Sequence, residues 1–92
     1  MFRALDDETR RLVLDELAAR DGQTLFELCS LLTMRHGVSL TRQAISQHLG
    51  VLEAAGLITT RRQGRSKFHY FNPEPLADIA RRWLPAEQRS DS

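Results

Sequence analysis

Four hydrogen-bonding side chains stand close together near the start of the segment TRQAISQHLGVLEAAGLITT, which covers residues 41–60: Arg42, Gln43, Ser46 and Gln47. Guanidinium, amide and hydroxyl groups of this kind recognise the edges of bases and the oxygens of phosphates without reacting with them. The same side chains could also form an ordinary solvated helix face. The segments around them favour the recognition of DNA.

The segment that carries these side chains has the pattern of a capped helix. Its apolar residues recur every three or four positions, as on one face of a helix: Ile45, Leu49 and Leu52, flanked by Val51 and Ala55. Thr41 is a good N-cap, because its hydroxyl can accept from the first free backbone N–H groups, and we expect it to face DNA as well. Gly56 follows the helix, where a left-handed C-cap is needed, and strand-forming residues begin at Leu57.

A cationic hairpin is predicted directly after this helix. Residues 57–62 and 67–72 have strand character, and the turn between them contains Gly64. Four cations lie on or beside that turn: Arg61, Arg62, Arg65 and Lys67. Residues 42–72 hold these cations and Arg42 against Glu53 alone, so positive charge is concentrated where a polyanion would bind. A solvated hairpin is the alternative, but the cations around the turn favour contacts with phosphates.

Two further helices are expected to support the polar one. The first covers residues 8–20 after an N-cap at Asp7, and its buried face is Val13, Leu14, Leu17 and Ala18. Its charged residues should lie mostly outside that face: Arg10, Arg11, Asp15 and Glu16. The second runs from residue 25 to about residue 33 and opens with a capping box of Thr24 and Glu27. Its buried stripe is Leu25, Leu28, Cys29 and Leu32, and a connector with a turn at Gly37 follows.

Apolar residues lie on one side of a short helix at each end of the chain. A helical lead-in over residues 1–5 places Phe2 and Leu5 on one side. A last helix over residues 76–84 has these apolar residues on one face: Leu76, Ile79, Ala80, Trp83 and Leu84. Trp83 would lie in the core or in the subunit interface. We expect one domain over residues 1–85 and a frayed tail over residues 86–92.

The three histidines and the single cysteine have more than one interpretation. His48 lies at the border of the buried stripe, where it could donate to a phosphate or simply fill a boundary position. His69 is expected on the surface of the second strand, and His36 in solvent. Cys29 shares its face with leucines, so a buried structural thiol is favoured over a redox or metalloid sensor.

Composition narrows the class of protein. Ninety-two residues make one domain, which is marginal alone and would gain stability from dimerisation. One cysteine, no apolar run near the roughly 18 residues of a membrane span, and a charged N-terminus predict a cytoplasmic protein. No nucleophile–base pair, phosphate-binding glycine loop or metal-ligand cluster is evident, so the sequence argues against an enzyme and predicts no cofactor or metal. A protein-interaction domain that does not bind DNA is the second hypothesis.

Helix, helix, helix, two-stranded hairpin and helix is the order of a winged helix-turn-helix, a mainly α fold with a small β-hairpin. The chain resembles the ArsR/SmtB family of bacterial transcriptional repressors in three stretches: residues 4–11, residues 41–58 and the hairpin at residues 61–70. Glu8 stands where proline is common in the family. The resemblance implies a homodimer, paired through its first and last helices, that binds a double-stranded DNA operator near a promoter.

The metal sites of the resembled family are incomplete in this sequence. One family site uses a Cys-x-Cys in the helix before the recognition helix, and here Cys29 is followed by Leu31 at the second position. Another uses Asp and His residues on the last helix, where Asp78 is present but no histidine follows His69. We therefore expect no metal sensing of these types. Control by expression level, by a partner protein or by an unrecognised effector stays open.

Overall fold

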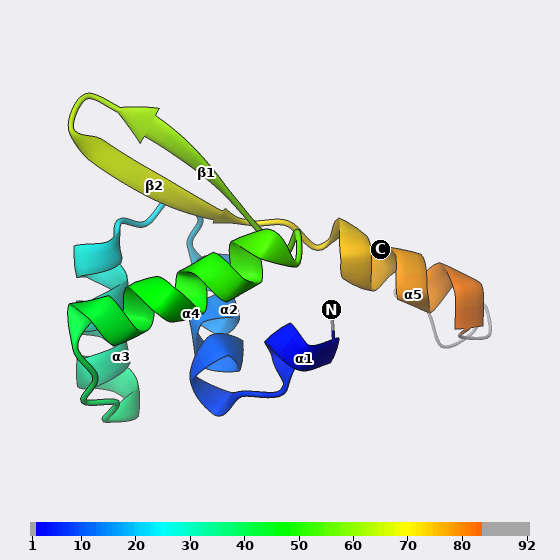
Figure 1. Cartoon of the computed structure of the whole chain (residues 1–92), viewed down its shortest axis with the longest axis horizontal. Helices are drawn as coiled ribbons and strands as arrows, with labels where there is room; N and C mark the ends of the chain where they lie inside the picture. Colours follow the sequence, from blue (N-terminus) through cyan, green and yellow to red (C-terminus); the bar gives the residue numbers. More distant parts are fainter. Residues whose placement is uncertain (1, 84–92) are drawn as a thin grey trace.

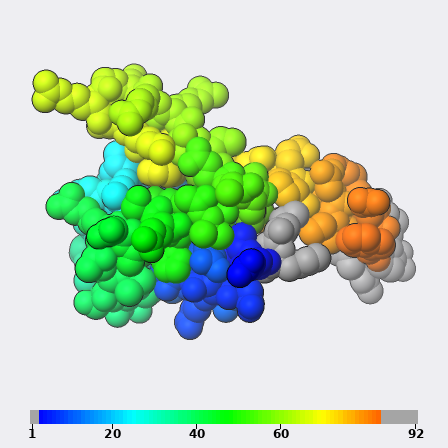
Figure 2. All heavy atoms as spheres, viewed as in Figure 1, coloured from blue at the N-terminus to red at the C-terminus, as the bar shows by residue number. Residues whose placement is uncertain are grey.

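The computed structural model describes residues 2–83, and of Phe2 only the backbone. Its elements, in chain order, are α1 Phe2–Leu5, α2 Glu8–Ala19, α3 Leu25–His36, α4 Arg42–Ala54, β1 Ile58–Gln63, β2 Ser66–Phe71 and α5 Glu74–Trp83. Helices α2, α3 and α4 form a body, with the hairpin and α5 projecting from it (Figures 1 and 2). The predicted element order is confirmed. Leu84 and the tail at residues 86–92 lie outside the described residues.

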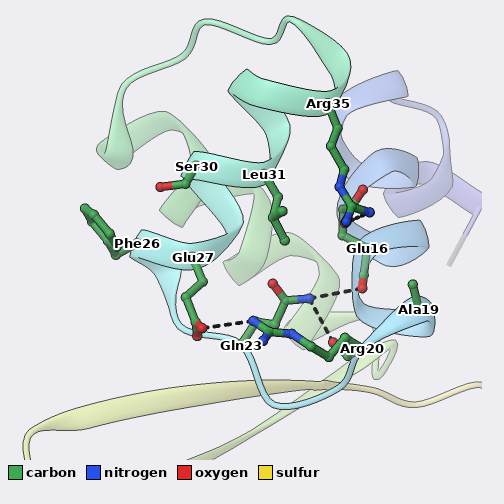
Figure 3. A pocket seen from close by; sticks show the side chains of 9 residues that line it. All are labelled: Glu16, Ala19, Arg20, Gln23, Phe26, Glu27, Ser30, Leu31 and Arg35. Atoms are coloured by element: carbon green, nitrogen blue, oxygen red, sulfur yellow. Dashed lines mark hydrogen bonds and ion pairs between the residues drawn. The ribbon is translucent and has the colours of Figure 1, made fainter.

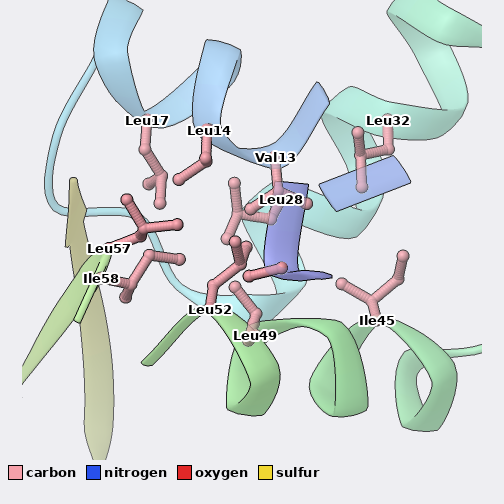
Figure 4. Close-up of a cluster of buried hydrophobic side chains, with 11 residues drawn as sticks. Val13, Leu14, Leu17, Leu28, Leu32, Ile45, Leu49, Leu52, Leu57 and Ile58 are labelled. Carbon is pink, nitrogen blue, oxygen red and sulfur yellow. The ribbon is translucent and has the colours of Figure 1, made fainter. Parts of the chain in front are cut away.

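The core lies where α2, α3, α4 and the start of β1 meet (Figure 4). Eight of its buried side chains come from the predicted helix faces: Val13, Leu14, Leu17, Leu28, Leu32, Ile45, Leu49 and Leu52. Leu57 and Ile58 are buried there as well, although the sequence predicted only their strand character. Ala18 was expected in this core but is exposed, and Cys29 is only half-buried. Burying leucine and isoleucine side chains contributes roughly 1.5–3 kcal/mol each. This packing holds α4 against α2 and α3 in a single orientation.

The prediction that Glu16 lies on the exposed side of α2 is wrong, because the structure buries this side chain. Its carboxylate lies 3.4 Å from Arg35 Nη1 and 2.9 Å from His36 Nε2. Helix α3 continues through His36, beyond the predicted end near Thr33, and so brings both partners to α2. A buried carboxylate is tolerated when it is paired in this way. His36 is exposed as a residue, as predicted, but its ring has a partner that the sequence did not indicate.

The connector between α3 and α4 is shorter than the sequence predicted. Gly37 ends α3 with a φ of 66°, in the left-handed region that favours glycine, as its place in the connector predicted. Thr41 then caps α4, and its side chain accepts from the backbone N–H of Ala44 at 3.1 Å. Because α3 is longer than predicted, the connector shrinks to residues 37–41.

The prediction that His69 lies on the surface of the second strand is also wrong, because this residue is buried. β1 and β2 pair in an antiparallel register that sets Thr60 opposite His69. The backbone of Gln23 forms an isolated bridge to His69, and the ring Nδ1 of His69 donates to the carbonyl oxygen of Gln23 at 2.9 Å. The segment before α3 thus acts as a one-residue third strand. This bridge attaches the base of the hairpin to the body.

Helix α5 begins at Glu74, two residues before the predicted start. Pro75 is tolerated there because the first turn of a helix needs no hydrogen bond from its backbone nitrogen. Leu76, Ile79 and Ala80 are half-buried, and no α5 residue in the described range is fully buried. Trp83 is 66% exposed, which excludes the core and leaves the subunit interface as the predicted position. Among the described residues, no helix is long and apolar enough to cross a membrane.

The capping box at the start of α3 provides the first testable prediction. Glu27 Oε1 accepts from the backbone N–H of Thr24 at 2.9 Å, and this bond, aided by Arg20, lowers the pKa of the Glu27 carboxyl below its ordinary value of 4.5. We expect Glu27→Ala to lower the free energy of unfolding at neutral pH by about 1 kcal/mol.

The pH dependence of this effect has a definite sign. Because the folded pKa is lowered, the stabilisation by the charged carboxylate is complete above pH 4.5 and is lost as the pH falls through the folded value. Urea unfolding at several pH values should show the gap between wild type and Glu27→Ala narrowing in acid. An equal gap at all pH values would mean that the carboxylate charge contributes nothing.

Candidate nucleic-acid interface

The N-terminal end of α4 presents the predicted polar face to solvent. Arg42, Gln43, Ser46 and Gln47 are all exposed, whereas Ile45 between them is 1% exposed and packs into the core. Buried and exposed positions alternate here with the helical period, so the core fixes which side chains face outward. The hydroxyl oxygen of the capping residue is occupied as an acceptor, but its hydrogen remains available for donation.

An aromatic ring supports the first of these side chains. The guanidinium carbon of Arg42 lies 6.0 Å from the centroid of the Phe26 ring, within the range of a cation–π contact. Phe26 is 63% exposed on α3. Phe26 was not predicted as a site residue, because its only signal in the sequence is an aromatic ring within a capped helix. The contact restricts the directions in which Arg42 can point.

His48 occupies the half-buried boundary position that was predicted, and Arg10 holds its ring. Arg10 Nη1 lies 3.2 Å from His48 Nδ1, while Arg10 Nε and Nη2 donate to the carbonyl oxygens of Ala4 at 2.8 Å and Arg3 at 3.0 Å. A guanidinium can only donate, so Nδ1 is the acceptor and the ring proton lies on Nε2. His48 therefore offers Nε2–H as a donor, and α1 is joined to α4 through one side chain.

This pair leads to a prediction about the ring. We expect Arg10→Met to release Nδ1, so that ¹⁵N spectra of the His48 ring show an increased share of the Nδ1–H tautomer. The lost hydrogen bonds should also lower the free energy of unfolding by about 1 kcal/mol. The neighbouring Arg11→Met is the matched control, since Arg11 Nη1 donates to the Leu5 carbonyl and does not touch the ring. A tautomer ratio that is equal in both variants would contradict the assignment.

The hairpin carries its four cations in the open. Arg61, Arg62, Arg65 and Lys67 are exposed, and within residues 2–83 none of them forms an ion pair. Arg62 stands directly opposite Lys67 in the register, an arrangement of like charges that destabilises a hairpin unless an anion lies nearby. Arg61 lies over the Tyr70 ring, 5.8 Å from its centroid. These charges are available to a polyanion.

A groove brings the helix and the hairpin together. It has a volume of about 390 Å³, and its walls include Ser46 from α4 and Arg65 and Lys67 from the hairpin. A hydrogen bond of 3.3 Å from the Thr60 hydroxyl to the Glu53 carboxylate joins the two elements at the other end. The groove therefore places Ser46, from the predicted base-reading face, beside two of the four predicted phosphate contacts.

Comparisons with known proteins identify the family of the chain. Residues 5–61 match the family model described as a helix-turn-helix domain. An uncharacterised HTH-type transcriptional regulator of Bacillus subtilis, YuzN, is 49% identical over 84 residues, which cover 91% of each chain. The solved ArsR-like transcriptional regulator from Rhodococcus sp. RHA1 superposes with a TM-score of 0.73 at 35% identity, over 87% of this chain and 67% of that one. The chain belongs to the ArsR family of helix-turn-helix regulators.

Another relative in the ArsR family is an arsenic resistance transcriptional regulator of Pseudomonas putida. It is 37% identical over 75 residues, but this chain spans only 53% of its length. The matching relatives are transcriptional regulators and not enzymes. The winged helix-turn-helix fold predicted from the sequence is confirmed.

Cys29 occupies the first cysteine position of the Cys-x-Cys pattern described for one family metal site. It is half-buried, and burial raises the pKa of its thiol above the ordinary value of 9.0, more strongly than the nearby Arg42 lowers it. The thiol is therefore protonated at neutral pH, which disfavours both nucleophilic attack and metal binding. Across residues 2–83, no three His, Cys, Asp or Glu side chains gather closely enough to hold a metal ion.

Proposed function

We propose that this ArsR-family chain is a homodimeric transcriptional repressor that acts in the cytoplasm and binds a two-fold symmetric operator in double-stranded DNA. The observation that carries the proposal is that the polar face of α4 and the four hairpin cations are all exposed, with Ser46, Arg65 and Lys67 lining one groove. Within residues 2–83 these cations form no ion pair. Repression would follow because the bound dimer excludes RNA polymerase from the promoter.

In this proposal α4 enters the major groove, which is wide enough for one helix. Arg42, Gln43 and Gln47 would read base edges, since guanidinium and amide groups form bidentate pairs with guanine and adenine. Thr41, Ser46 and the Nε2–H of His48 would contact phosphates and hold the register. The four hairpin cations would follow the backbone beside the adjacent minor groove. The two copies of α4 in a dimer would read half-sites about one helical turn apart.

We propose that the dimer forms through α1 and α5. Leu76, Ile79 and Ala80 are half-buried and Trp83 is exposed, so the apolar face of α5 is incompletely covered within one subunit. A groove of about 480 Å³, lined by Leu5, α2 and the start of α5, lies beside it. A second copy of α5 would cover both surfaces. Phe2 and Leu84 were predicted to join this interface, but their side chains lie outside the described part of the chain.

Sedimentation tests the dimer directly. We expect Ile79→Asp to convert the dimer to monomers at micromolar concentration, because the charge would lie in the apolar interface. Asp78→Ala is the matched control on the exposed side of the same helix, and it should stay dimeric. A wild-type protein that sediments as a monomer would refute this part of the proposal.

We also propose that the regulator senses no metal of the two family types, since Cys29 has no second cysteine at residue 31 and α5 has no histidine. Isothermal titration of the purified dimer with Zn²⁺ and with arsenite should show no tight binding. Repression would then be relieved by another effector.

Mapping the bound sites across the genome is the experiment that tests the proposed function. We expect discrete sites at promoters, each with a two-fold symmetric sequence. Gel shifts on those sites should show binding at moderate salt that random duplex DNA of equal length does not compete away. Equal binding to both DNAs would overturn the proposal.

A further inference from the structure

A pocket on the side of the body shares Phe26 with the groove between α4 and the hairpin, and no residue with the groove beside α5. It lies between α2 and α3 and has a volume of about 450 Å³ (Figure 3). Pockets that bind small molecules have volumes of a few hundred Å³ or more. Ala19, Phe26 and Leu31 supply apolar surface to its walls, and Gln23 lies at its base.

Within residues 2–83, one buried oxygen of the Gln23 side chain has no hydrogen-bond partner. Gln23 is 0% exposed, and its Nε2 donates to the carbonyl oxygens of Glu16 at 3.0 Å and Arg20 at 2.8 Å. These two bonds fix the orientation of the amide, because Oε1 cannot donate to a carbonyl. Oε1 therefore faces the opposite way, towards Leu31, where it accepts no hydrogen bond (Figure 3). A buried acceptor in this state costs free energy that a donor would recover.

The charges around the pocket are already balanced. Arg20 lies 2.9 Å from Glu27, and Arg35 lies 3.4 Å from Glu16, so each cation at the rim is paired with a carboxylate. An ionic ligand would have to break one of these pairs. A neutral molecule would leave both intact.

We propose that this pocket binds a small, neutral, largely aromatic molecule whose single hydroxyl or N–H group donates to Gln23 Oε1. The ring would lie against Leu31 and Ala19, the apolar residue that α2 contributes to the lining. Leu31 is half-buried, and the proposal requires its side chain to change rotamer so that the donor reaches the oxygen. The pocket is partly open, so the end of the molecule away from the donor would stay in water.

Gln23 connects this pocket to the hairpin. The same residue that supplies the unpaired oxygen forms the backbone bridge to His69, with its carbonyl accepting from the His69 N–H at 2.8 Å. A ligand that moves Gln23 therefore acts on the base of β2. The inference concerns a ligand site and does not depend on the proposed repressor activity.

Phenol and anisole form a pair of probes, because both carry one oxygen on a benzene ring and only phenol can donate a hydrogen bond. We expect titration of the ¹⁵N-labelled full chain with phenol to produce saturable shifts at the side-chain amide of Gln23 and at backbone amides of α2 and α3. The Kd for phenol should be in the millimolar range, and that for anisole about tenfold weaker. Smaller shifts at His69 should follow the same saturation curve.

Two tryptophan variants of α3 test the location. Leu31→Trp should fill the pocket and abolish the phenol shifts. Met34→Trp is the control, since Met34 is 82% exposed on the same helix and does not line this pocket. A dispersed spectrum establishes that each variant is folded. Three results would overturn the inference: no saturable shift with phenol, equal affinity for anisole, or unchanged phenol binding by Leu31→Trp. DNA binding is not measured, so a failure here leaves the proposed function untouched.

Discussion

Replacing Arg42, Gln43 and Gln47 together with alanine is expected to weaken operator binding by at least about a hundredfold, while binding to random DNA changes much less. Each bidentate contact with the correct base contributes roughly 1–3 kcal/mol of discrimination, and a factor of a hundred needs about 2.7 kcal/mol in total. All three side chains are exposed and none supports the core. The variant should therefore fold like the wild type, and its defect should be one of recognition.

Fluorescence anisotropy on the mapped operator and on a scrambled duplex measures the two affinities. The matched control is Val51→Ala, which shortens a side chain that is 40% exposed at the other end of α4. Because Val51 has no polar group to offer to DNA, this variant should leave the operator affinity unchanged. If the triple variant binds and regulates like the wild type, α4 does not read bases. The protein-interaction domain would then be the better hypothesis.

The features that could be predicted from the sequence are those with a local cause. The exposed face of α4 follows from the spacing of Ile45, Leu49 and Leu52, and the cap at Thr41 follows from its place before that run. Both depend on residues within a few positions of each other. The cationic hairpin was predicted for the same reason, since its turn and its alternation lie within one short segment.

The features that could not be predicted depend on partners far along the chain. His69 has the alternation of a surface strand, but Gln23, 46 positions earlier, covers it. Glu16 looks like an exposed helix residue until α3 brings Arg35 and His36 to it. The ring of His48 is held by Arg10 from 38 positions away. Each is a polar side chain that is buried or oriented by a tertiary hydrogen bond, and periodicity carries no signal for such bonds.

Replacing all four hairpin cations with alanine should change DNA binding in a different way from the triple alanine variant of α4. If Arg61, Arg62, Arg65 and Lys67 each neutralise one phosphate, the slope of log K against log salt should become less steep by about 0.9 per contact. Four contacts in each of two subunits correspond to a change of roughly 7 in that slope. Affinity for the operator and for random DNA should fall together, because phosphates carry no base identity. The ratio of the two affinities should therefore change little.

Two single substitutions that remove the same charge from different places also test the role of the hairpin. Arg62→Ala and Arg82→Ala each remove one exposed cation, the first from the hairpin and the second from α5. We expect only the first to reduce the salt slope, by about 0.9 per subunit. Sedimentation of Arg82→Ala establishes that its dimer is intact. If both variants change the slope equally, net charge and not the hairpin determines DNA affinity, and the hairpin has no specific place on the duplex.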